Sequence, residues 1–405
     1  MQYPAYIGNI LERLELSGEE AYLVGGSLRD SLLGIAPHDF DITTSALPER
    51  TREIFSDFRV LDIGLKHGTV TVMTEGGPVE ITTFRVDGAY TDARHPDSVC
   101  FTDRIEEDLS RRDFTVNAMA YHPHKGLVDP FGGREDLKRK RIRAVGDPGL
   151  RFSEDALRIM RAFRFSAQLG FSVEEETLAG AAAMREGLSR IAAERICSEF
   201  IRLLTSAEPA GAIRRMRQTG VLPYVTGAYA PSEETVGLIA KMPATDVARL
   251  GMYFAEAEPV VIDGVLHDLK CSAKQIRGAA AVARGAGMPL ATPADAARLI
   301  AGTGVYAEDA ARAAVLLGRA PEEAVRFVSE NRRPTRIADL AVNGRDLAQI
   351  GISGRETGRI LSELLDQTMN EPEQNRKEIL LRLAKEKSEK TSGGKNQNNR
   401  QEQQR

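Results

Sequence analysis

The sequence predicts a multi-domain α+β protein, in which a mixed α/β domain comes first and an all-α remainder follows. Up to about Leu137 the chain alternates the signals of strands, turns and helices. From Ser153 onward the strand signals fade and the apolar residues follow a helical period. With 405 residues, the chain is long enough to fold as two or more domains that each have a core.

The composition excludes the membrane and disulfide-rich classes of protein. No apolar run reaches the length of a membrane span, and the N-terminus lacks a signal-peptide pattern, so we expect a cytoplasmic protein without a membrane partner. Cys100, Cys197 and Cys271 are far apart and lack metal-ligand spacing, which predicts buried free thiols. Because the net charge is −4, a nucleic-acid partner must be held by local basic patches.

The residues after position 20 predict a phosphate-binding turn. Tyr22–Val24 is a short apolar strand, which Gly25-Gly26 breaks, and Ser27–Leu33 follows as a helix. A strand, a glycine turn and a helix N-terminus present unpaired backbone N–H groups to a phosphate. Arg29 lies in the first turn of that helix and adds a fixed charge with a bidentate donor fork.

Two aspartates after this helix predict a metal site. Asp39-Phe40-Asp41-Ile42 resumes a strand pattern, so Asp39 and Asp41 lie on one face of the strand. Two carboxylates this close repel each other unless a cation lies between them, and Mg²⁺ prefers oxygen ligands. A glycine turn or two surface aspartates are each common when they occur alone. Together, the phosphate-binding turn and the carboxylate pair predict two-metal nucleotidyl transfer.

Further helices and strands are predicted for the same domain. They are the helices Ile7–Leu16 and Pro48–Phe55 and the strands His67–Val72 and Pro78–Arg85. Ser45 is the expected cap of the second helix, and the two strands form a hairpin. If that hairpin joins the strand of Asp41, Glu80 is either a third carboxylate near the metals or an outward-facing side chain. The sequence leaves both open.

Three polar segments follow. Asp87–Phe101 has no periodicity and predicts a long loop that is functional or disordered. In Arg111-Arg112-Asp113, with Asn117 one turn further on, two arginines share one carboxylate. This leaves donors for a phosphate or ribose, unless the segment is only a self-paired charge cluster. Leu137–Arg143 is a basic run that either contacts RNA phosphates or forms a solvated strand.

The first long helix is predicted to begin at Ser153, its cap, and to carry a base-reading pair. Asp155 and Arg158 are three apart and therefore neighbours on the helix, and Arg161 and Arg164 continue the same ribbon. A carboxylate beside a guanidinium matches C or A, because Asp155 accepts from the exocyclic amine while Arg158 donates to the ring nitrogen or O2. U and G present a carbonyl there and are repelled. An exposed ion pair is the plainer alternative.

Four motifs, in order, carry a family resemblance. They are Gly25-Gly26-Ser27-Leu28-Arg29-Asp30, Asp39-Phe40-Asp41, Arg111-Arg112-Asp113-Phe114-Thr115-Val116-Asn117-Ala118 and Glu154-Asp155-Ala156-Leu157-Arg158. With this order and spacing the chain resembles the class II tRNA nucleotidyltransferases, the CCA-adding enzymes of the polymerase-β-like superfamily. The resemblance covers most of the chain. Ser189–Leu204 is similar to the motif that closes the neck, and Leu340–Ala384 is similar to the tail helices of Firmicutes-type members.

The resemblance implies a polymerase-β-like mixed α/β head followed by an all-α neck, body and tail. In this sequence the parts are the catalytic head at 1–138, the neck with the nucleotide-selecting helix at 139–205, the body at 206–300 and the tRNA-binding tail at 301–385. Residues 386–405 are rich in Lys, Glu, Gln and Asn, and we expect them to be disordered. Asp87–Phe101 is at the place of the family's flexible loop, which relatives that add only CC lack.

The resemblance also implies roles for individual residues. Asp39 and Asp41 are implied to be catalytic and to bind Mg²⁺. The residues implied to bind the nucleotide are Gly26, Arg29, Arg112, Asp155, Arg158, Arg161 and Arg164. Within this set Asp155 and Arg158 would act as the protein template, which agrees with the edge-reading argument made from the residues alone.

The implied activity is template-independent addition of CCA to the 3′ end of tRNA from CTP and ATP with Mg²⁺. The implied partner is the acceptor and T arms of tRNA, and a homodimer is left open. An enzyme that adds only A is a close alternative. A bacterial poly(A) polymerase shares the head motifs, but a strongly basic C-terminal extension would favour it, and this tail is mixed and short. A non-enzymatic RNA-binding protein would lack the metal carboxylates, and both are present.

Overall fold

The structure, a computed structural model, describes residues 3–37, 39–64, 68–88 and 99–402. By its internal contacts the chain divides into two compact units. Unit 1 is Met1–Ala230 with Asp268–Lys270, and unit 2 is Pro231–His267 with Cys271–Arg405. The division at residue 230 falls within the predicted body at 206–300, and the finer division into head, neck, body and tail stays a prediction.

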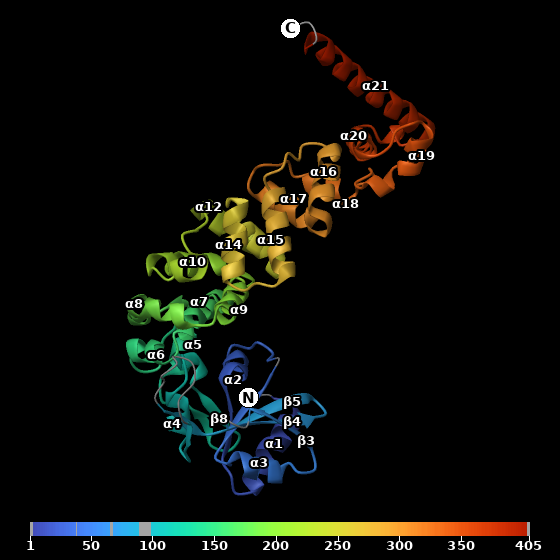
Figure 1. The fold of residues 1–405 in the computed structure, drawn as a ribbon. Helices are drawn as coiled ribbons and strands as arrows, with labels where there is room; N and C mark the ends of the chain where they lie inside the picture. The colour runs from blue at the N-terminus through green and yellow to red at the C-terminus, as the bar shows by residue number, and fades with distance from the viewer. Residues whose placement is uncertain (1–2, 38, 65–67, 89–98, 403–405) are drawn as a thin grey trace. The chain divides into compact units, whose positions relative to one another are not determined.

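Unit 1 begins with a mixed sheet and its helices and continues as helices, which confirms the predicted α+β class (Figure 1). In chain order its elements are α1 Ala5–Leu16, β1 Ala21–Val24, α2 Gly25–Leu32, β2 Asp41–Thr44, α3 Pro48–Ile54, β3 Arg59–Gly64, β4 Thr69–Thr74, β5 Gly77–Thr83, β6 Arg85–Asp87, β7 Val99–Phe101, α4 Ile105–Ser110, η2 Thr115–Asn117, β8 Ala120–His122, β9 Gly126–Val128, α5 Gly133–Lys138, β10 Arg141–Ile142, α6 Pro148–Glu154, α7 Leu157–Leu169, β11 Ser172–Val173, α8 Glu175–Met184, η3 Arg185–Arg190, α9 Ala193–Leu204, α10 Pro209–Gln218 and α11 Pro223–Thr226.

A seven-stranded mixed sheet with the order β3-β4-β5-β2-β1-β8-β9 forms the centre of the first part of unit 1. Strand β2 pairs with β1 antiparallel and with β5 in parallel. The predicted hairpin of β4 and β5 is present, with Val72 opposite Val79. Because β5 also pairs with β2, the hairpin brings Glu80 directly beside Asp41 in the register of the sheet.

Strand β1 is central because both of its faces are buried. Its four residues are all buried, and they alternate between two cores. Leu23 packs in a core with Ile10 of α1, whereas Tyr22 and Val24 pack in a core with Leu109 of α4. Burial of a side chain the size of Val or Leu contributes about 1.5–3 kcal/mol, so a strand that is buried on both faces stabilises the whole sheet.

Two element boundaries near this strand differ from the prediction. Helix α2 begins at Gly25, two residues before the predicted Ser27, because Gly25 adopts a φ of +72° and turns the chain directly out of the strand. Ser45 does not cap α3, whose N-cap is Leu47 without a side-chain hydrogen bond. The Ser45 hydroxyl instead accepts the amide N–H of Glu20 at 2.9 Å, so a long-range contact replaces the local cap.

The ends of the predicted loop Asp87–Phe101 pair with each other. Strands β6 and β7 form a two-stranded antiparallel sheet, and the middle of the loop, 89–98, lies outside the described residues. Cys197 and Cys271 are buried as predicted, but Cys100 on β7 is exposed. A sheet of two short strands cannot cover both of its faces, so the prediction of a buried thiol is wrong at this position.

The helix predicted to start at Ser153 is in fact two helices. Helix α6 is capped by Asp147, and Ser153 lies in its last turn. The chain is extended at Asp155, with a φ of −141° and a ψ of 104°, before α7 begins at Leu157. The Asp155 carboxylate accepts the amide N–H of Leu157 at 3.0 Å. Short acidic side chains compete with helix continuation in this way, so Asp155 precedes a helix and does not lie within one.

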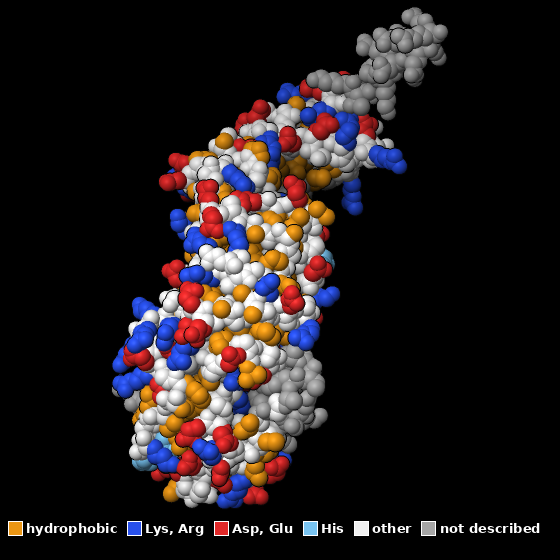
Figure 2. Space-filling model, turned by 90° about the vertical axis from the view of Figure 1, so that its left-hand side faces the viewer, with side chains coloured by type: hydrophobic (Ala, Val, Ile, Leu, Met, Phe, Trp, Pro, Cys, Tyr) orange, Lys and Arg blue, Asp and Glu red, His pale blue; other side chains and the backbone are white. Residues whose placement is uncertain are grey.

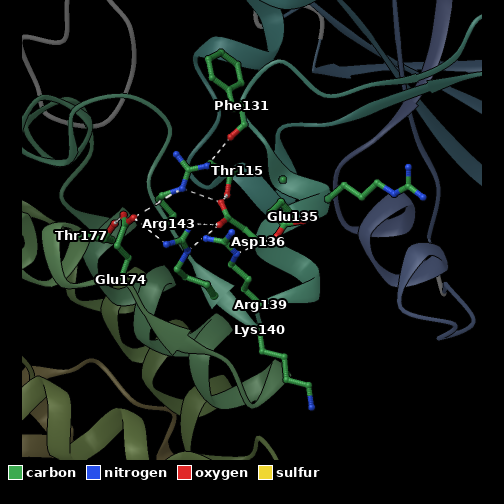
Figure 3. Close-up of polar contacts among 12 residues, drawn as sticks. Thr115, Phe131, Glu135, Asp136, Arg139, Lys140, Arg143, Glu174 and Thr177 are labelled. Carbon is green, nitrogen blue, oxygen red and sulfur yellow. Dashed lines mark hydrogen bonds and ion pairs between the residues drawn. The ribbon is translucent and has the colours of Figure 1, made fainter.

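The second half of the basic run Leu137–Arg143 faces inward (Figure 3). Arg141 and Arg143 each donate from Nε to the carboxylate of Asp136 at 2.8 Å, and Asp136 is fully buried. These two arginines are therefore partners of a buried carboxylate, which requires them, and their contact with RNA stays a prediction. The side chains of 138–140 are exposed.

Unit 2 is helical throughout its named elements. In chain order they are α12 Glu233–Leu238, η4 Ile239–Lys241, α13 Asp246–Tyr253, α14 Pro259–Asp268, α15 Ala273–Gly285, α16 Pro293–Thr303, η5 Gly304–Tyr306, α17 Ala307–Leu316, α18 Ala324–Ser329, η6 Ile337–Asp339, α19 Gly344–Gln349, α20 Arg355–Asn370, η7 Pro372–Gln374 and α21 Lys377–Glu402. One core joins α16, α17 and α18, and another joins α19, α20 and α21.

The C-terminal helix is longer than the sequence predicts. Helix α21 continues to Glu402, whereas the composition predicts disorder for 386–405. Leu380 and Ala384 fix the start of this helix in a core. Lys, Glu, Gln and Arg have helix propensities close to that of Ala, so a polar run can extend a helix that is already formed.

Charges of both signs are interspersed over the face in Figure 2, and they nearly balance in the whole sequence, whose net charge is −4. Within the part of the chain that the structure describes, no helix is both long and apolar enough to cross a membrane.

Candidate active site

Unit 1 contains a polar cavity of about 620 Å³. All of the residues predicted to bind metal or nucleotide line it, namely Gly26, Arg29, Asp39, Asp41, Arg112, Asp155, Arg158, Arg161 and Arg164. The other lining residues are Gly25, Arg111, Asp113, Asn117, Leu157, Phe165, Arg195 and Arg202. The fold thus brings the four sequence motifs to one place, while the role of each residue stays a prediction.

The two predicted catalytic carboxylates lie where strand β2 begins. Asp41 is the first residue of β2, and Asp39 lies two positions earlier, outside the strand. In the register of the sheet Asp41 is paired with Val24 on β1 and with Glu80 on β5. The turn after β1 passes close to this carboxylate, because a Cβ added at Gly25 would lie 3.2 Å from Asp41 Oδ2.

The surroundings of Asp41 disfavour its negative charge. Its side chain is open to solvent, but the protein around it removes part of its hydration and raises its pKa. Arg112 opposes this rise, whereas Glu80 and Asp39 add to it. A divalent cation relieves such repulsion, and carboxylate oxygens are the ligands that Mg²⁺ prefers. The donor set of Asp39 and Asp41 therefore fits a metal ion.

Glu80 adds a negative charge next to this pair without completing a three-ligand group. Among the residues that the structure describes, no group of three or more His, Cys, Asp or Glu side chains is arranged to hold a metal ion. Glu80 is thus a neighbour of Asp41 in the sheet and lines a smaller cavity together with it, and whether it contributes to metal binding stays a prediction.

Arg29 is held firmly in the wall of the cavity. Its residue is 4% exposed, its Nε donates to Asp30 at 2.8 Å, and its Nη1 donates to Asn117 Oδ1 at 2.9 Å. The guanidinium carbon lies 5.1 Å from the centre of the Phe165 ring, a favourable cation–π position. Because its contacts come from different segments, the guanidinium is oriented before any anion arrives.

A buried carboxylate that the sequence analysis did not single out holds the arginine pair. Asp108 on α4 is fully buried and accepts from Arg111 Nε and Nη2 at 3.0 and 2.7 Å and from Arg112 Nη2 at 3.2 Å. Burial alone would raise the pKa of Asp108, but Arg112 and Arg111 outweigh it and lower the pKa. The available signal was the spacing, since Asp108 precedes the two arginines by three and four positions.

Asp113 joins the same segment to helix α7. Its carboxylate accepts from Arg161 Nε at 2.7 Å and from Asn117 Nδ2 at 3.1 Å. Burial opposes the ionisation of Asp113, but Arg161, Asn117 and Arg158 outweigh it and lower the pKa to about 2. Asp113 therefore binds an arginine from a distant helix, whereas Arg111 and Arg112 pair locally with Asp108.

Asp113→Asn should change how the stability of the fold depends on pH. A carboxyl whose pKa is lower in the folded protein stabilises the fold above its unfolded pKa, and this stabilisation is lost as the pH falls toward the folded pKa. For Asp113 the interval runs from 3.8 to about 2, equivalent to about 2 kcal/mol. Urea unfolding from pH 7 to pH 2 should show a stability difference between wild type and variant that shrinks below pH 4. A difference that is independent of pH would contradict this pairing.

The predicted base-reading residues do not form an ion pair with each other. Asp155 Oδ2 accepts from Arg195 Nη2 at 3.0 Å, whereas Arg158 Nη1 donates to Glu154 at 2.5 Å. The cause is the break between α6 and α7, which puts Asp155 ahead of the helix. Both side chains still line the cavity, as the base-reading hypothesis requires. The ion pair that was predicted between them is not formed.

Helix α9 contributes side chains that the sequence analysis missed. Arg195, Glu199 and Arg202 follow the i, i+4, i+7 spacing and therefore share one face of the helix. Arg195 binds Asp155, Glu199 lies 2.6 Å from Arg164 Nε, and Arg202 lines the cavity. The spacing of these residues predicts that they share one face of α9, but it does not predict which neighbouring helix packs against that face.

The cavity has an excess of positive charge. Its arginines are Arg29, Arg111, Arg112, Arg158, Arg161, Arg164, Arg195 and Arg202, and its carboxylates are Asp39, Asp41, Asp113 and Asp155. Burial lowers the pKa of Arg164 to about 10, with Glu199 opposing this shift, so Arg164 stays charged at neutral pH. Guanidinium groups in such number favour a polyanion such as a nucleoside triphosphate.

Two family models match unit 1. The model described as the poly A polymerase head domain matches residues 21–143, which include Asp39, Asp41 and Arg112. The model described as a probable RNA and SrmB-binding site of polymerase A matches residues 170–228, which include helix α9.

Relatives and solved structures match the chain over most of its length. A CCA-adding enzyme of Leuconostoc mesenteroides is 37% identical over 366 residues, which cover 88% of this chain and 89% of the relative. The crystal structure of the Bacillus stearothermophilus CCA-adding enzyme in complex with CTP has a TM-score of 0.80 at 31% identity and covers 97% of this chain and 100% of that one. A solved complex of a CCA-adding enzyme with ATP has a TM-score of 0.68 at 26% identity and covers 91% and 90%. The resemblance carried by the four motifs is confirmed over nearly the whole chain, which belongs to the family of CCA-adding enzymes, the tRNA nucleotidyltransferases.

Proposed function

We propose that this chain adds C, C and A to the 3′ end of tRNA, with CTP and ATP as substrates and pyrophosphate as the leaving group. The observation that carries the proposal is one cavity in which Asp39 and Asp41 lie together with an excess of arginines and with Asp155. Paired carboxylates beside phosphate-binding donors are the parts that phosphoryl and nucleotidyl transfer require. The full-length relatives are CCA-adding enzymes, which supports this product over others.

The triphosphate would be held by groups next to the carboxylates. A Cβ at Gly25 would lie 3.2 Å from Asp41 Oδ2 and 3.6 Å from Arg112 Nη1, so the arginine is close to the carboxylate. A guanidinium in this position forms charge-assisted hydrogen bonds with phosphate oxygens and with the leaving pyrophosphate. The N-terminus of α2 adds backbone N–H donors, and Arg29 adds a second guanidinium held in place by Asn117.

Asp39 and Asp41 are the residues that would hold Mg²⁺. When bound, the ion supplies positive charge that favours ionisation of the attacking 3′-hydroxyl and neutralises charge on the leaving pyrophosphate. Their oxygen donors and the raised pKa of Asp41 support this assignment.

Base selection would rest on Asp155 and Arg158. Each Asp155 oxygen already accepts one hydrogen bond, from the Leu157 amide and from Arg195. A carboxylate oxygen has a second lone pair, so Asp155 is oriented and can still accept from the amine of C or A. Arg158 donates its Nη2 to the carbonyl of Arg111 at 3.0 Å, which fixes its plane beside the same cavity.

Asp108→Asn should weaken the use of the nucleotide more than the use of tRNA. The change removes the charge that orients Arg112, and we expect kcat/KM for CTP to fall about 10- to 100-fold, the loss typical of a reacting geometry displaced by about 1 Å. The KM for tRNA should stay within about threefold, because Asp108 is fully buried. Steady-state kinetics, with thermal melting to confirm folding, measures both.

Glu107→Gln is the matched control for this variant. Glu107 precedes Asp108 on α4, but it binds Thr102 at 2.7 Å and does not line the cavity. If the two variants lose CTP use equally, Asp108 has no special role in orienting Arg112.

Poly(A) synthesis is the second candidate function. The observation that favours it is the head-domain model, whose description names poly A polymerase. Both enzymes need the same carboxylates and phosphate donors, so the head domain does not distinguish a CCA-adding enzyme from a poly(A) polymerase. The reaction products distinguish the two.

The test is extension of purified tRNA that ends before CCA and of tRNA that ends in CC. Each is incubated with CTP, ATP or both in the presence of Mg²⁺, and the products are resolved at single-nucleotide length. We expect C, C and a single A on the first substrate and a single A on the second. Action on the second substrate alone would show an enzyme that adds only A, and a long A ladder would show a poly(A) polymerase. No extension of either RNA would overturn the proposal.

A further inference from the structure

A second charge cluster lies outside the cavity, around the buried Asp136 on helix α5 (Figure 3). Asp136 Oδ1 accepts from Arg141 Nε at 2.8 Å. Its Oδ2 accepts from Arg143 Nε at 2.8 Å and from the hydroxyl of Thr115 at 2.7 Å. Asp136 and Thr115 are both fully buried, whereas the two arginine side chains are 29% and 30% exposed.

The two arginines neutralise the charge of Asp136. The hydroxyl of Thr115 links the cluster to the segment around residue 115. Removing a carboxylate from water offsets much of its attraction to the two arginines, so the cluster adds little net stability. Its geometry is nevertheless well defined, since each carboxylate oxygen has at least one partner in place. What the cluster holds is the segment to which Thr115 belongs.

Thr115 is the first residue of η2, which lies between two residues that line the cavity, Asp113 and Asn117. Main-chain bonds hold the same segment to the residues that directly follow β10. The Thr115 N–H donates to the carbonyl of Arg143 at 2.9 Å, and the Val145 N–H donates to the carbonyl of Asp113 at 3.1 Å. The segment is therefore held by two main-chain hydrogen bonds and by the hydrogen bond from the Thr115 hydroxyl to Asp136.

Helix α5 also approaches the backbone of this segment closely. A Cβ added at Gly133 would lie 2.2 Å from the carbonyl oxygen of Thr115 and 2.9 Å from Met119 Cγ. Only a glycine permits this approach at the start of the helix that carries Asp136. The contact and the hydroxyl bond together limit how far the segment can move.

We propose that Asp136, acting through the hydroxyl of Thr115, is a positioning residue for nucleotide addition. Two residues to either side of Thr115 are Asp113 and Asn117, which bind the arginines of the cavity wall. Without the hydroxyl bond, the carboxylate of Asp113 and the amide of Asn117 lose their fixed orientation, and the arginines shift with them. The inference rests on the proposed function, because it assigns Asp136 a part in that reaction.

The test removes the hydroxyl and keeps the shape of the side chain. Thr115→Val should lower kcat for the addition of C to tRNA about tenfold or more, as expected for displaced reacting groups. The KM for tRNA should not change, because Thr115 is fully buried. Thr115→Ser, which keeps the hydroxyl, should restore most of the rate. Steady-state kinetics separates kcat from KM, and thermal melting reports the stability of each variant.

Thr177→Val is the matched control. Thr177 is also fully buried, and its hydroxyl donates to Glu174 at 3.1 Å and accepts the Ala144 N–H at 3.1 Å in the same network. It does not line the cavity. We expect this variant to lose melting temperature to a similar degree as Thr115→Val while its kcat stays within about twofold of wild type, since the change leaves Asp136 bound to Thr115.

Equal kcat losses in the two valine variants, or a Thr115→Ser variant as slow as Thr115→Val, would overturn the positioning role of Asp136. If a valine variant does not fold, Thr115→Ala and Thr177→Ala make the same comparison. If the wild type is active but Thr115→Val and Thr177→Val lose kcat equally, only this inference is overturned. A wild type that extends no RNA overturns the proposed function and this inference with it.

Discussion

Asp41→Asn is expected to abolish nucleotide addition, with a fall in kcat of at least about 1000-fold. An amide oxygen carries no charge and is a poor ligand for Mg²⁺, and a catalytic metal supplies several kcal/mol of stabilisation to the transition state, at about 1.4 kcal/mol for each factor of ten. Asp39→Asn should behave in the same way. Single-turnover extension of tRNA ending in CC, with ATP and Mg²⁺, measures the loss directly.

Asp41→Asn should not lower the stability of the fold. The pKa of Asp41 is raised in the folded protein, so its ionisation lowers stability as the pH rises from the unfolded toward the folded pKa. Removing the charge should therefore leave the melting temperature in a chelator equal to that of wild type or higher. A lower melting temperature would show that Asp41 has a stabilising partner and that the loss of activity has a structural cause.

Glu80→Gln is the control for the metal assignment. It removes a carboxylate from the position paired with Asp41 on the next strand, and it should keep activity within about tenfold because Glu80 does not complete a three-ligand group among the described residues. A loss as large as that of Asp41→Asn would make Glu80 a third ligand. If Asp41→Asn keeps more than a tenth of the wild-type rate, the catalytic role proposed for Asp41 is wrong.

Asp155→Ala is expected to remove the preference for CTP and ATP over UTP and GTP, by about 10- to 100-fold in the ratio of kcat/KM. This range corresponds to one bidentate contact with a base edge. The carboxylate both attracts the amine of C or A and repels the carbonyl of U or G, so its loss should act mainly through faster use of the wrong nucleotides. Competition among all four nucleotides on tRNA lacking CCA, with sequencing of the products, measures the preference.

Glu154→Gln is the matched control for this prediction. Glu154 is adjacent in sequence and binds Arg158 and Arg151, but it does not line the cavity. The variant should slow the reaction without changing which nucleotides are used. Unchanged selection in Asp155→Ala would contradict the base-reading hypothesis, and lost selection in both variants would move the role from Asp155 to the orientation of Arg158.

The parts of the site that could be predicted are those encoded locally. The strand, the glycine turn and the helix at Tyr22–Leu32 follow from neighbouring residues, because a glycine with positive φ and an apolar run act over a few positions. The spacing of Asp39 and Asp41 is likewise local. These features were enough to predict that Arg29, Asp39 and Asp41 lie at one site, as the lining of the cavity confirms.

The pairing of charges could not be predicted in the same way. Asp155 was expected beside Arg158, but a break in the helix at Asp155 leaves it bonded to Arg195, and Arg158 binds Glu154. Arg141 was expected to face RNA or solvent, but it binds the buried Asp136. With many arginines and acids nearby, several pairings have similar Coulomb energies, and burial and backbone direction decide among them.

The sequence by itself determined the α+β class, the order of the motifs and many of the residues that line the cavity, because apolar periodicity and turn chemistry are properties of short segments. Only the tertiary structure decided which partner holds each charged group, that Asp108, Asp113 and Asp136 are buried, and that α9 reaches the cavity. The physical reason is that a charge is stabilised by the groups around it in space, and these come from helices and strands that are distant in the chain.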